Sequence, residues 1–263
     1  MGEHIEIEDA FVPDISTIDL RKELATPNPA NGEEFLRRKA KTSARLGVWR
    51  AGARYRTETL LRFRADHAAA MDAVFSDVSD EFLAKNNLVS VSTVCQSKDE
   101  FLTHPDLGGQ FSPESVACIK KICAPNPRVL VYASDGLSST AVEANFEDTY
   151  LSIKQGLEVY GIECGTPFFV KYGGVRAMDV ITQALNAEVV IVLLGERPGL
   201  VTGESMSAYI SYKGYPGMPE VHRIVVSNIH RDGTTPVEGG AHIAHIAYEW
   251  LQQKVESGME LKL

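Results

Sequence analysis

The sequence predicts an α/β protein with a doubly wound, mostly parallel sheet, preceded by a helical N-terminal part. Downstream of Pro127, strand-like apolar runs alternate with longer helical patterns, which is typical of a parallel sheet covered by helices. The run from Val189 to Leu194 contains no polar residue and is mostly β-branched. A run this short and this apolar is typical of a strand buried on both faces. Upstream of Pro127 the apolar spacing is mainly helical.

The composition limits the classes of function. The chain has 263 residues, of which 44% are hydrophobic, and a formal net charge of -9. That charge disfavours nucleic acid and anionic membranes as partners, and no apolar run approaches the ~18 residues that a membrane-spanning helix needs. The acidic N-terminus shows no export signal, and the four cysteines form no CxxC pair. We therefore expect a cytoplasmic chain with reduced thiols.

Three segments are expected along the chain. Residues 1–31 carry scattered charge, glycine and proline, which indicates a flexible arm with one short helix near 16–25. Residues 32–125 are predicted to form a mainly helical part, and residues 126–263 the α/β domain. The segment 33–56 is strongly basic. Such a segment either faces an acidic partner or forms a solvated surface, and the sequence leaves both interpretations open.

Three elements are predicted inside the helical part. Apolar residues recur at helical spacing over 57–77, which indicates an amphipathic helix capped by Thr57. Alternation over 87–96 predicts a short strand. A further helix is predicted over 112–124, with Ser112 as its N-cap.

Strands and helices alternate regularly in the α/β part. Glycine and proline dominate the turn after residue 194, because the chain must leave the sheet sharply there. This order predicts that the carboxyl ends of several strands meet at one edge, where open α/β sheets usually bind ligands. The predicted strands with their turns cover 128–134, 165–174, 189–194 and 222–230, and the predicted helices cover 139–160, 175–186, a segment opening at Glu204, and 237–257.

The common motifs of nucleotide and acyl chemistry are missing. No GxGxxG follows a predicted strand, and GLVTGES lacks the GK[ST] ending of a phosphate loop. The segment 203–207 lacks the last glycine of a nucleophile elbow, which disfavours a hydrolase that uses Ser205. His242 and His245 have the spacing of a metal pair on a helix, but no third ligand lies near them in the sequence. Two exposed histidines are the favoured interpretation.

Several strand ends together form the candidate ligand site. Glycines at these ends let the backbone approach a large, flat ligand, and valines offer apolar contact. The polar groups are one glutamate, one aspartate, one arginine and hydroxyls, which suits a binding platform better than a complete active site. The alternative is a set of ordinary turns with no ligand. The segments are Ser134-Asp135-Gly136-Leu137, Tyr172-Gly173-Gly174-Val175, Gly195-Glu196-Arg197 and Val225-Val226-Ser227-Asn228.

Six longer stretches follow one family pattern in a single register, within about residues 45–250. They are RTETLLRFRADHAAAMDAVF, FLTHPDLG, SDGLSSTAVEANFED, GTPFFVKYGGVRAMD, VVIVLLGERPGLVTGESMSAY and VSNIHRDGTTPVEGGA. Together they resemble the light chain (small subunit) of ethanolamine ammonia-lyase. The resemblance implies a Rossmann-like, cobalamin-binding α/β domain on this chain, and a TIM-barrel large subunit that holds the substrate.

The reaction that the resemblance implies is the radical conversion of ethanolamine to acetaldehyde and ammonia, with adenosylcobalamin as the cofactor. The competing interpretation is a stand-alone α/β binding or regulatory protein. Some members of the family are packaged in a bacterial microcompartment. The expected location is therefore the cytoplasm, free or inside such a shell.

The resemblance also implies where the cofactor is contacted. The family's contacts fall on Val175 in FVKYGGV and Glu196 in LLGERPG, and on Val225 in HRIVVSNIH, where the family often has cysteine. Gly174 stands where a basic residue is frequent. No catalytic residue and no metal ligand is expected on this chain.

The histidines bear on the lower ligand of the cobalt. One common mode of cobalamin binding replaces the cofactor's own base by the histidine of a D-x-H-x-x-G loop. None of the seven histidines has an aspartate two positions before it, and His230 comes nearest to a strand end. We therefore expect base-on adenosylcobalamin, with its nucleotide tail near Ser134 and Asp135.

Overall fold

The structure of the chain is a computed structural model that describes residues 15–253. It divides into two units, Met1–Ala69 and Ala70–Leu263. The first residues of the predicted arm, 1–14, and the predicted end of the last helix, 254–257, lie outside the described residues. The division falls inside the segment 32–125, well before the predicted start of the α/β domain.

The first unit contains short elements and the start of a long helix. The helix predicted near 16–25 is instead two 3-10 turns, because the Asp19 side chain accepts the Arg21 amide at 3.1 Å and starts a new turn. Buried Asp66 pairs with Arg45 at 2.5 Å, so one guanidinium of the basic segment is used inside the chain. The elements are η1 (Ile15–Thr17), η2 (Leu20–Lys22), α1 (Gly32–Lys39), the antiparallel pair β1 (Arg50–Ala51) and β2 (Arg54–Tyr55), and α2 (Thr57–Phe75), which confirms the predicted long helix.

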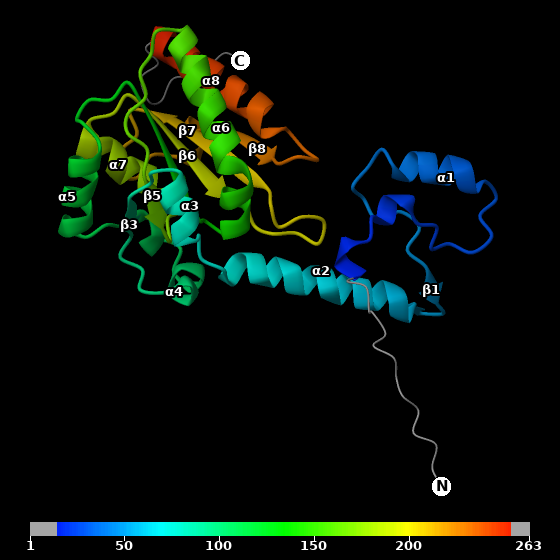
Figure 1. Cartoon of the computed structure of the whole chain (residues 1–263). Coiled ribbons are helices and arrows are strands. Elements are labelled where there is room, and N and C mark those ends of the chain that lie inside the picture. Colours follow the sequence, from blue (N-terminus) through cyan, green and yellow to red (C-terminus); the bar gives the residue numbers. More distant parts are fainter. Residues whose placement is uncertain (1–14, 254–263) are drawn as a thin grey trace. The chain divides into compact units, whose positions relative to one another are not determined.

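The second unit is built on a six-stranded sheet with the order β3-β5-β4-β6-β7-β8 (Figure 1). The first four strands in that order are parallel, β7 is antiparallel to β6, and β8 is antiparallel to β7. The predicted α/β class with a mostly parallel sheet is confirmed. The elements are α3 (Asp80–Lys85), β3 (Ser90–Ser92), α4 (Lys98–Thr103), η3 (Leu107–Gly109), α5 (Pro113–Ile122), β4 (Val129–Ser134), α6 (Ser139–Val159), β5 (Phe169–Lys171), α7 (Ala177–Leu185), β6 (Val189–Gly195), β7 (Met206–Tyr212), η4 (Glu220–His222), β8 (Ile224–Ile229) and α8 (Pro236–Gln253).

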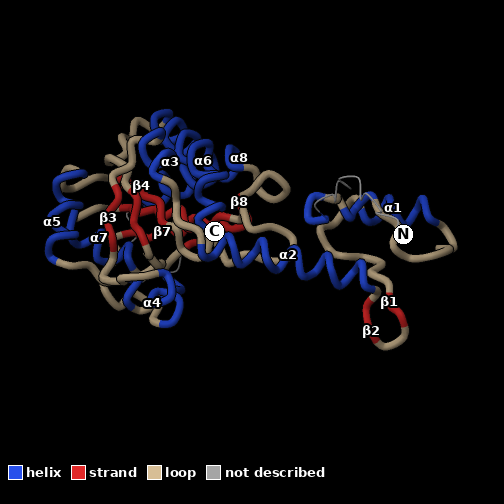
Figure 2. The backbone as a smooth tube through the Cα atoms, turned by 60° about the horizontal axis from the view of Figure 1, so that its bottom comes forward, coloured by secondary structure: helices blue, strands red, loops and turns tan. Residues whose placement is uncertain are grey.

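Helices cover both faces of this sheet (Figures 1 and 2). Helices α6 and α8 pack on one face, over Val189, Ile191 and Leu193 of β6. Helices α5 and α7 pack on the other face, over Val190 and Val192. Every residue of β6 is buried, and the strand pairs with β4 on one side and β7 on the other. The unbroken apolar run of this strand correctly predicted its central position.

One predicted element is wrong, and another is shorter than expected. The sequence suggested a helix opening at Glu204, but Met206–Tyr212 form strand β7, which pairs along the whole of β6. The physical reason is that nearly all side chains of this segment are buried, on both faces of the sheet rather than along one helical stripe. The strand predicted over 87–96 is confined to Ser90–Ser92, and it pairs with β5 at the edge of the sheet. The segment assigned to the helical part thus contributes a strand to the sheet.

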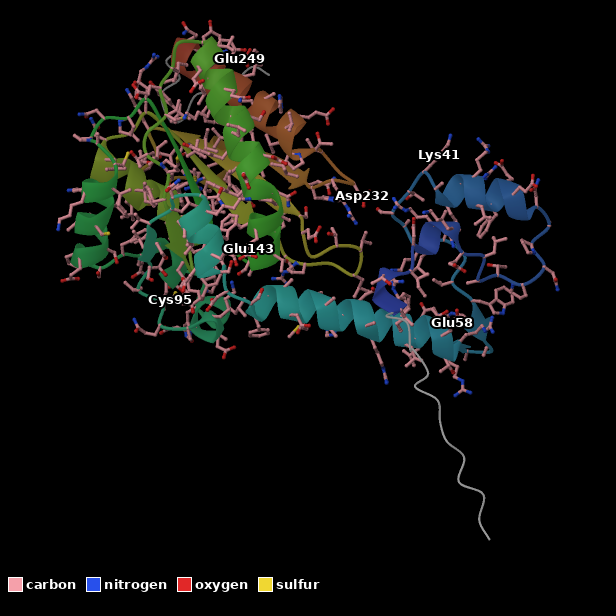
Figure 3. The ribbon with its side chains drawn as sticks, viewed as in Figure 1. Lys41, Glu58, Cys95, Glu143, Asp232 and Glu249 are labelled. Atoms are coloured by element: carbon pink, nitrogen blue, oxygen red, sulfur yellow. The ribbon has the colours of Figure 1, made fainter. Side chains whose placement is uncertain are left out.

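Side chains at the helix ends tie the elements of the second unit together. Ser112 caps α5 as predicted, because its Oγ accepts the Ser115 amide at 3.1 Å. Glu143 of α6, labelled in Figure 3, accepts the Ser79 amide at 2.6 Å at the start of α3. The first contact caps the start of α5 locally, and the second joins α6 to α3.

Candidate functional site

Three turns meet at the carboxyl edge of the parallel strands β4, β5 and β6. They follow Ser134, Lys171 and Gly195, the last residues of those strands. Glycine lets the turns pack closely. A Cβ on Gly195 would lie 2.5 Å from the Asp135 carbonyl oxygen, and a Cβ on Gly173 would lie 2.5 Å from Ser134 Oγ. The three segments therefore lie together at one edge, as the sequence predicted.

Tyr172 opens the turn after β5 in a left-handed conformation, with a φ of 58°. This conformation costs a residue with a side chain about 1–2 kcal/mol, so the surrounding structure must support it. Asp135 Oδ1 accepts the Tyr172 amide at 2.8 Å, and Thr93 Oγ1 donates to the Tyr172 carbonyl at 3.1 Å. The turn that leads to Val175 is thereby held at both peptide groups of its strained residue.

Asp135 is itself buried and is paired with a buried lysine. Its exposed fraction is 1%, and that of Lys98 is 7%. Lys98 Nζ lies 3.4 Å from Asp135 Oδ2 and donates to the Gly136 carbonyl at 2.9 Å. Burial raises the pKa of Asp135, while Lys98 and the amides of Tyr172 and Gly173 partly offset that rise. The pair joins the start of α4 to the end of β4.

Ser134 and Asp135, the two residues expected beside the cofactor's nucleotide tail, both use their side chains in contacts within the protein. Ser134 is fully buried, and its Oγ lies within donating distance of the carbonyl oxygens of Val170, at 2.7 Å, and Gly173, at 3.1 Å. The Asp135 carboxylate is bound to Lys98 and to the β5 turn. A ligand that reached this point would meet the backbone of the turns rather than these side chains.

Glu196 follows β6 and connects the ends of three neighbouring strands. Its Oε2 accepts from Ser205 Oγ at 2.7 Å, and its Oε1 accepts from Ser207 Oγ and from the Asn228 amide at 2.9 Å. Burial alone would raise the pKa of Glu196, but these hydrogen bonds and nearby His230 outweigh it and lower the pKa. A carboxylate has about four acceptor positions, and within residues 15–253 these three hydrogen bonds leave one position, on Oε2, unused.

Val175 lines a pocket of about 350 Å³ beside the β5 turn. Part of the lining is apolar, and part is charged. This combination suits a ligand with an uncharged body and a polar edge. The other lining residues are Phe101, Pro105, Asp106, Gly174, Arg176 and Glu220.

Val225 lies within β8, set back from the carboxyl edge. It pairs with Tyr209 of β7. The alternate residues Ile224 and Val226 pack against the core beneath α6 and α8, so Val225 faces the other side of the sheet. There it is 45% exposed, and Tyr209 beside it is only partly buried. This part of the sheet offers an open apolar surface.

The three residues expected to contact the cofactor lie on or after different strands of one sheet. Val175 follows β5, Glu196 follows β6 and Val225 lies in β8, with β4, β6 and β7 between the outer two strands. At about 4.8 Å between neighbouring strands, four spacings put β5 and β8 roughly 19 Å apart. A ligand that contacts all three residues must therefore be broad. We call the surface that carries these three residues and the adjoining turns the platform.

Metal-binding side chains are not grouped in the described part of the chain. Among residues 15–253, no three His, Cys, Asp or Glu side chains are placed to hold a metal ion together. His230 Nε2 lies 2.9 Å from Asn228 Oδ1, and its Nδ1 accepts the Asp232 amide at 3.3 Å. His242 and His245 are exposed on α8. The favoured interpretation of the last two as exposed helical histidines is confirmed.

Comparison with known proteins decides the family. Residues 32–262 match the family described as Ethanolamine ammonia-lyase light chain (EutC). The chain belongs to this family. It is 58% identical over 254 residues to the ethanolamine ammonia-lyase small subunit of Clostridium perfringens, covering 97% of this chain and 86% of that protein. The small subunit of Lachnoclostridium phytofermentans is 55% identical over 261 residues, with coverages of 99% and 88%, and that of Listeria monocytogenes is 51% identical over 256 residues, with coverages of 97% and 87%.

The chain is therefore a subunit of a carbon–nitrogen lyase, and a small subunit implies a large one. A subunit need not carry every reacting group. This agrees with strand ends whose aspartate and glutamate are largely engaged inside the protein. Within residues 15–253, no helix has the length and apolar character needed to cross a membrane.

Proposed function

We propose that this chain holds adenosylcobalamin against the large subunit of ethanolamine ammonia-lyase, a TIM barrel that binds the substrate. The enzyme then converts ethanolamine to acetaldehyde and ammonia. One observation carries the proposed role: the platform is four strand spacings broad, and it offers glycine backbone, valines and one carboxylate. A surface of this kind binds a large ligand but supplies few groups for proton transfer.

The residues present fit a corrin, which is a broad, flat ring fringed with amide groups. Gly174 has no side chain and lines the pocket, so a ligand in the pocket can approach the backbone of this turn. Val175 and the half-exposed Val225 offer apolar contact. The open acceptor position on Glu196 can take one hydrogen bond from an amide at the edge of the ring. The substitution of valine for the family's frequent cysteine keeps an apolar contact at residue 225.

When bound, adenosylcobalamin supplies the radical that starts the reaction. The residues of this chain bind the cofactor, orient it and exclude water from it. Glu196 is ionised and held in one orientation by Ser205, Ser207 and the Asn228 amide. The β5 turn is fixed by hydrogen bonds before any ligand arrives, so little conformational entropy is lost there on binding.

The first prediction concerns assembly. With purified chains, ammonia should be released from ethanolamine only when this chain, the large subunit and adenosylcobalamin are all present. This chain alone should bind the cofactor weakly, because the platform covers one side of a flat ligand and leaves the other side in water. A coupled assay for acetaldehyde measures turnover, and a titration with adenosylcobalamin, with and without the large subunit, measures the affinity for the cofactor. Ammonia release by this chain alone, or equal cofactor affinity with and without the large subunit, would refute the proposal.

The second prediction concerns the lower ligand of the cobalt, which we propose is the cofactor's own base. Both ring nitrogens of His230, the histidine nearest these strand ends, are engaged by Asn228 and Asp232. Protein labelled with nitrogen-15 should therefore leave the nitrogen splitting in the EPR spectrum of bound, unlabelled cob(II)alamin unchanged. A splitting that changes on protein labelling would show that a histidine of either chain ligates the cobalt.

A further inference from the structure

We propose that the buried pair Lys98–Asp135 is a positioning device for the cofactor. The Asp135 carboxylate fixes the turn after β5 and so places Val175, and Lys98 holds that carboxylate and one wall of the adjacent pocket. The inference rests on the proposed function, because it takes Val175 as part of the cofactor platform.

Asp135 acts through the backbone and not on a ligand. Only 1% of its surface is exposed, and both of its oxygens have partners inside the protein. Oδ1 accepts the amide of Tyr172, whose left-handed φ of 58° needs support. Oδ2 faces Lys98 Nζ at 3.4 Å. One carboxylate therefore joins the end of β4, the start of α4 and the turn that leads to Val175.

Lys98 links the same carboxylate to a second residue that lines the pocket. It is the first residue of α4, and its Nζ lies 5.7 Å from the centre of the Phe101 ring on the same helix. Phe101 lines the pocket together with Val175. The loop that follows α4 returns to the β5 turn, where the Gly108 carbonyl accepts the Gly174 amide at 2.8 Å. The ion pair thus contacts one residue that lines the pocket, Phe101, and the turn that leads to another, Val175.

Stability alone does not account for such a pair. Moving two charges out of water costs about as much as their attraction returns, and a well-packed neutral replacement is often equally stable. The Tyr172 amide, by contrast, specifically needs an acceptor oxygen at the position of Asp135 Oδ1. The pair therefore has two separable roles, the ion pair itself and the acceptor for the Tyr172 amide. Both charges can be removed together without loss of the turn, whereas removal of the Asp135 oxygen should free the turn.

Two double variants of the two-chain enzyme test this separation. Lys98→Met with Asp135→Asn removes both charges and keeps an acceptor oxygen. Lys98→Met with Asp135→Leu removes the same charges and has a side chain of similar shape without the oxygen. Hydrogen exchange of the peptide that contains Tyr172–Val175, the Kd for adenosylcobalamin and the Tm are measured for both variants and for the wild type.

We expect the Asn variant to keep near wild-type exchange and affinity. In the Leu variant, exchange at the β5 turn should accelerate and the Kd should rise by at least about tenfold. Its Tm should also fall below that of the Asn variant, because the Tyr172 amide loses its acceptor. Equal Kd values and equal exchange in the two variants, with any loss confined to the Tm, would show a merely structural pair and overturn the inference. Failure of the wild-type enzyme to bind the cofactor would instead overturn the proposed function, and the exchange comparison would still decide whether Asp135 fixes the turn.

Discussion

Gly195→Ala is expected to lower the free energy of unfolding of the chain by at least about 3 kcal/mol, at the upper end for overpacking. A Cβ at this position would overlap the Ser138 carbonyl oxygen and would lie 2.5 Å from that of Asp135. These backbone atoms cannot give way easily. The Leu137 amide donates to the Gly195 carbonyl at 3.0 Å, and Ser138 Oγ caps α6 by accepting the Ala141 amide. Urea denaturation followed by far-UV circular dichroism measures the change.

Gly199→Ala in the same loop is the matched control. A Cβ there would meet only the Val201 amide nitrogen, at 4.0 Å, so we expect a change within about 0.5 kcal/mol. The comparison separates close packing of the strand ends from a general effect of adding a methyl group to a loop. If both variants were equally stable, the turns after β4 and β6 would not be packed as tightly as the structure has them.

The fold could be predicted wherever the pattern that decides it is local. The run from Val189 to Leu194 predicted the central strand, because six consecutive apolar, mostly β-branched residues are too few for a helix and suit a buried strand. The segment Met206–Tyr212 was misread because a buried antiparallel strand also leaves an apolar pattern without strict alternation. Its pairing partner lies across a loop, and this part of the sequence gives no sign of that pairing. The place of β3 at Ser90–Ser92 in the sheet also depends on such a distant pairing, since this strand joins the sheet through β5.

The candidate site could be located from the sequence but not described in detail. Glu196 was predicted at the candidate site because it follows a buried strand, yet its partners Ser207 and Asn228 come from strands whose pairing was not predicted. Lys98 was missed altogether. Its partner Asp135 is far away in the sequence, and no spacing rule separates a buried lysine from an exposed one. The resemblance to a family supplied Val175, Glu196 and Val225 as contacts, and their role in binding stays a prediction.

Glu196→Ala is expected to weaken both the fold and the binding of the cofactor. The change leaves two serine hydroxyls and the Asn228 amide without their acceptor, and losing hydrogen bonds to a charged group costs about 1.5–3 kcal/mol. Because Glu196 holds the ends of β7 and β8 against β6, the Kd for adenosylcobalamin in the two-chain enzyme should rise by about tenfold. Arg197→Ala, at the exposed neighbouring residue, should change the free energy of unfolding by less than about 0.5 kcal/mol. A wild-type Kd for Glu196→Ala would limit the residue to a structural role.

The pH dependence of stability can separate the contribution of the Glu196 charge from that of its side-chain shape. Hydrogen bonds hold the pKa of Glu196 below its ordinary value of 4.5 despite burial, so its ionised form stabilises the folded chain. That stabilisation is fully present above the unfolded pKa and is lost as the pH falls through the lower folded pKa. Glu196→Gln cannot titrate, so the gap in unfolding free energy between the wild type and this variant should be constant near neutral pH and should shrink on acidification below 4.5. Urea denaturation at a series of pH values measures the gap. If the gap stayed constant through the acid range, the serine hydroxyls and the Asn228 amide would bind the neutral carboxyl group as well as the carboxylate.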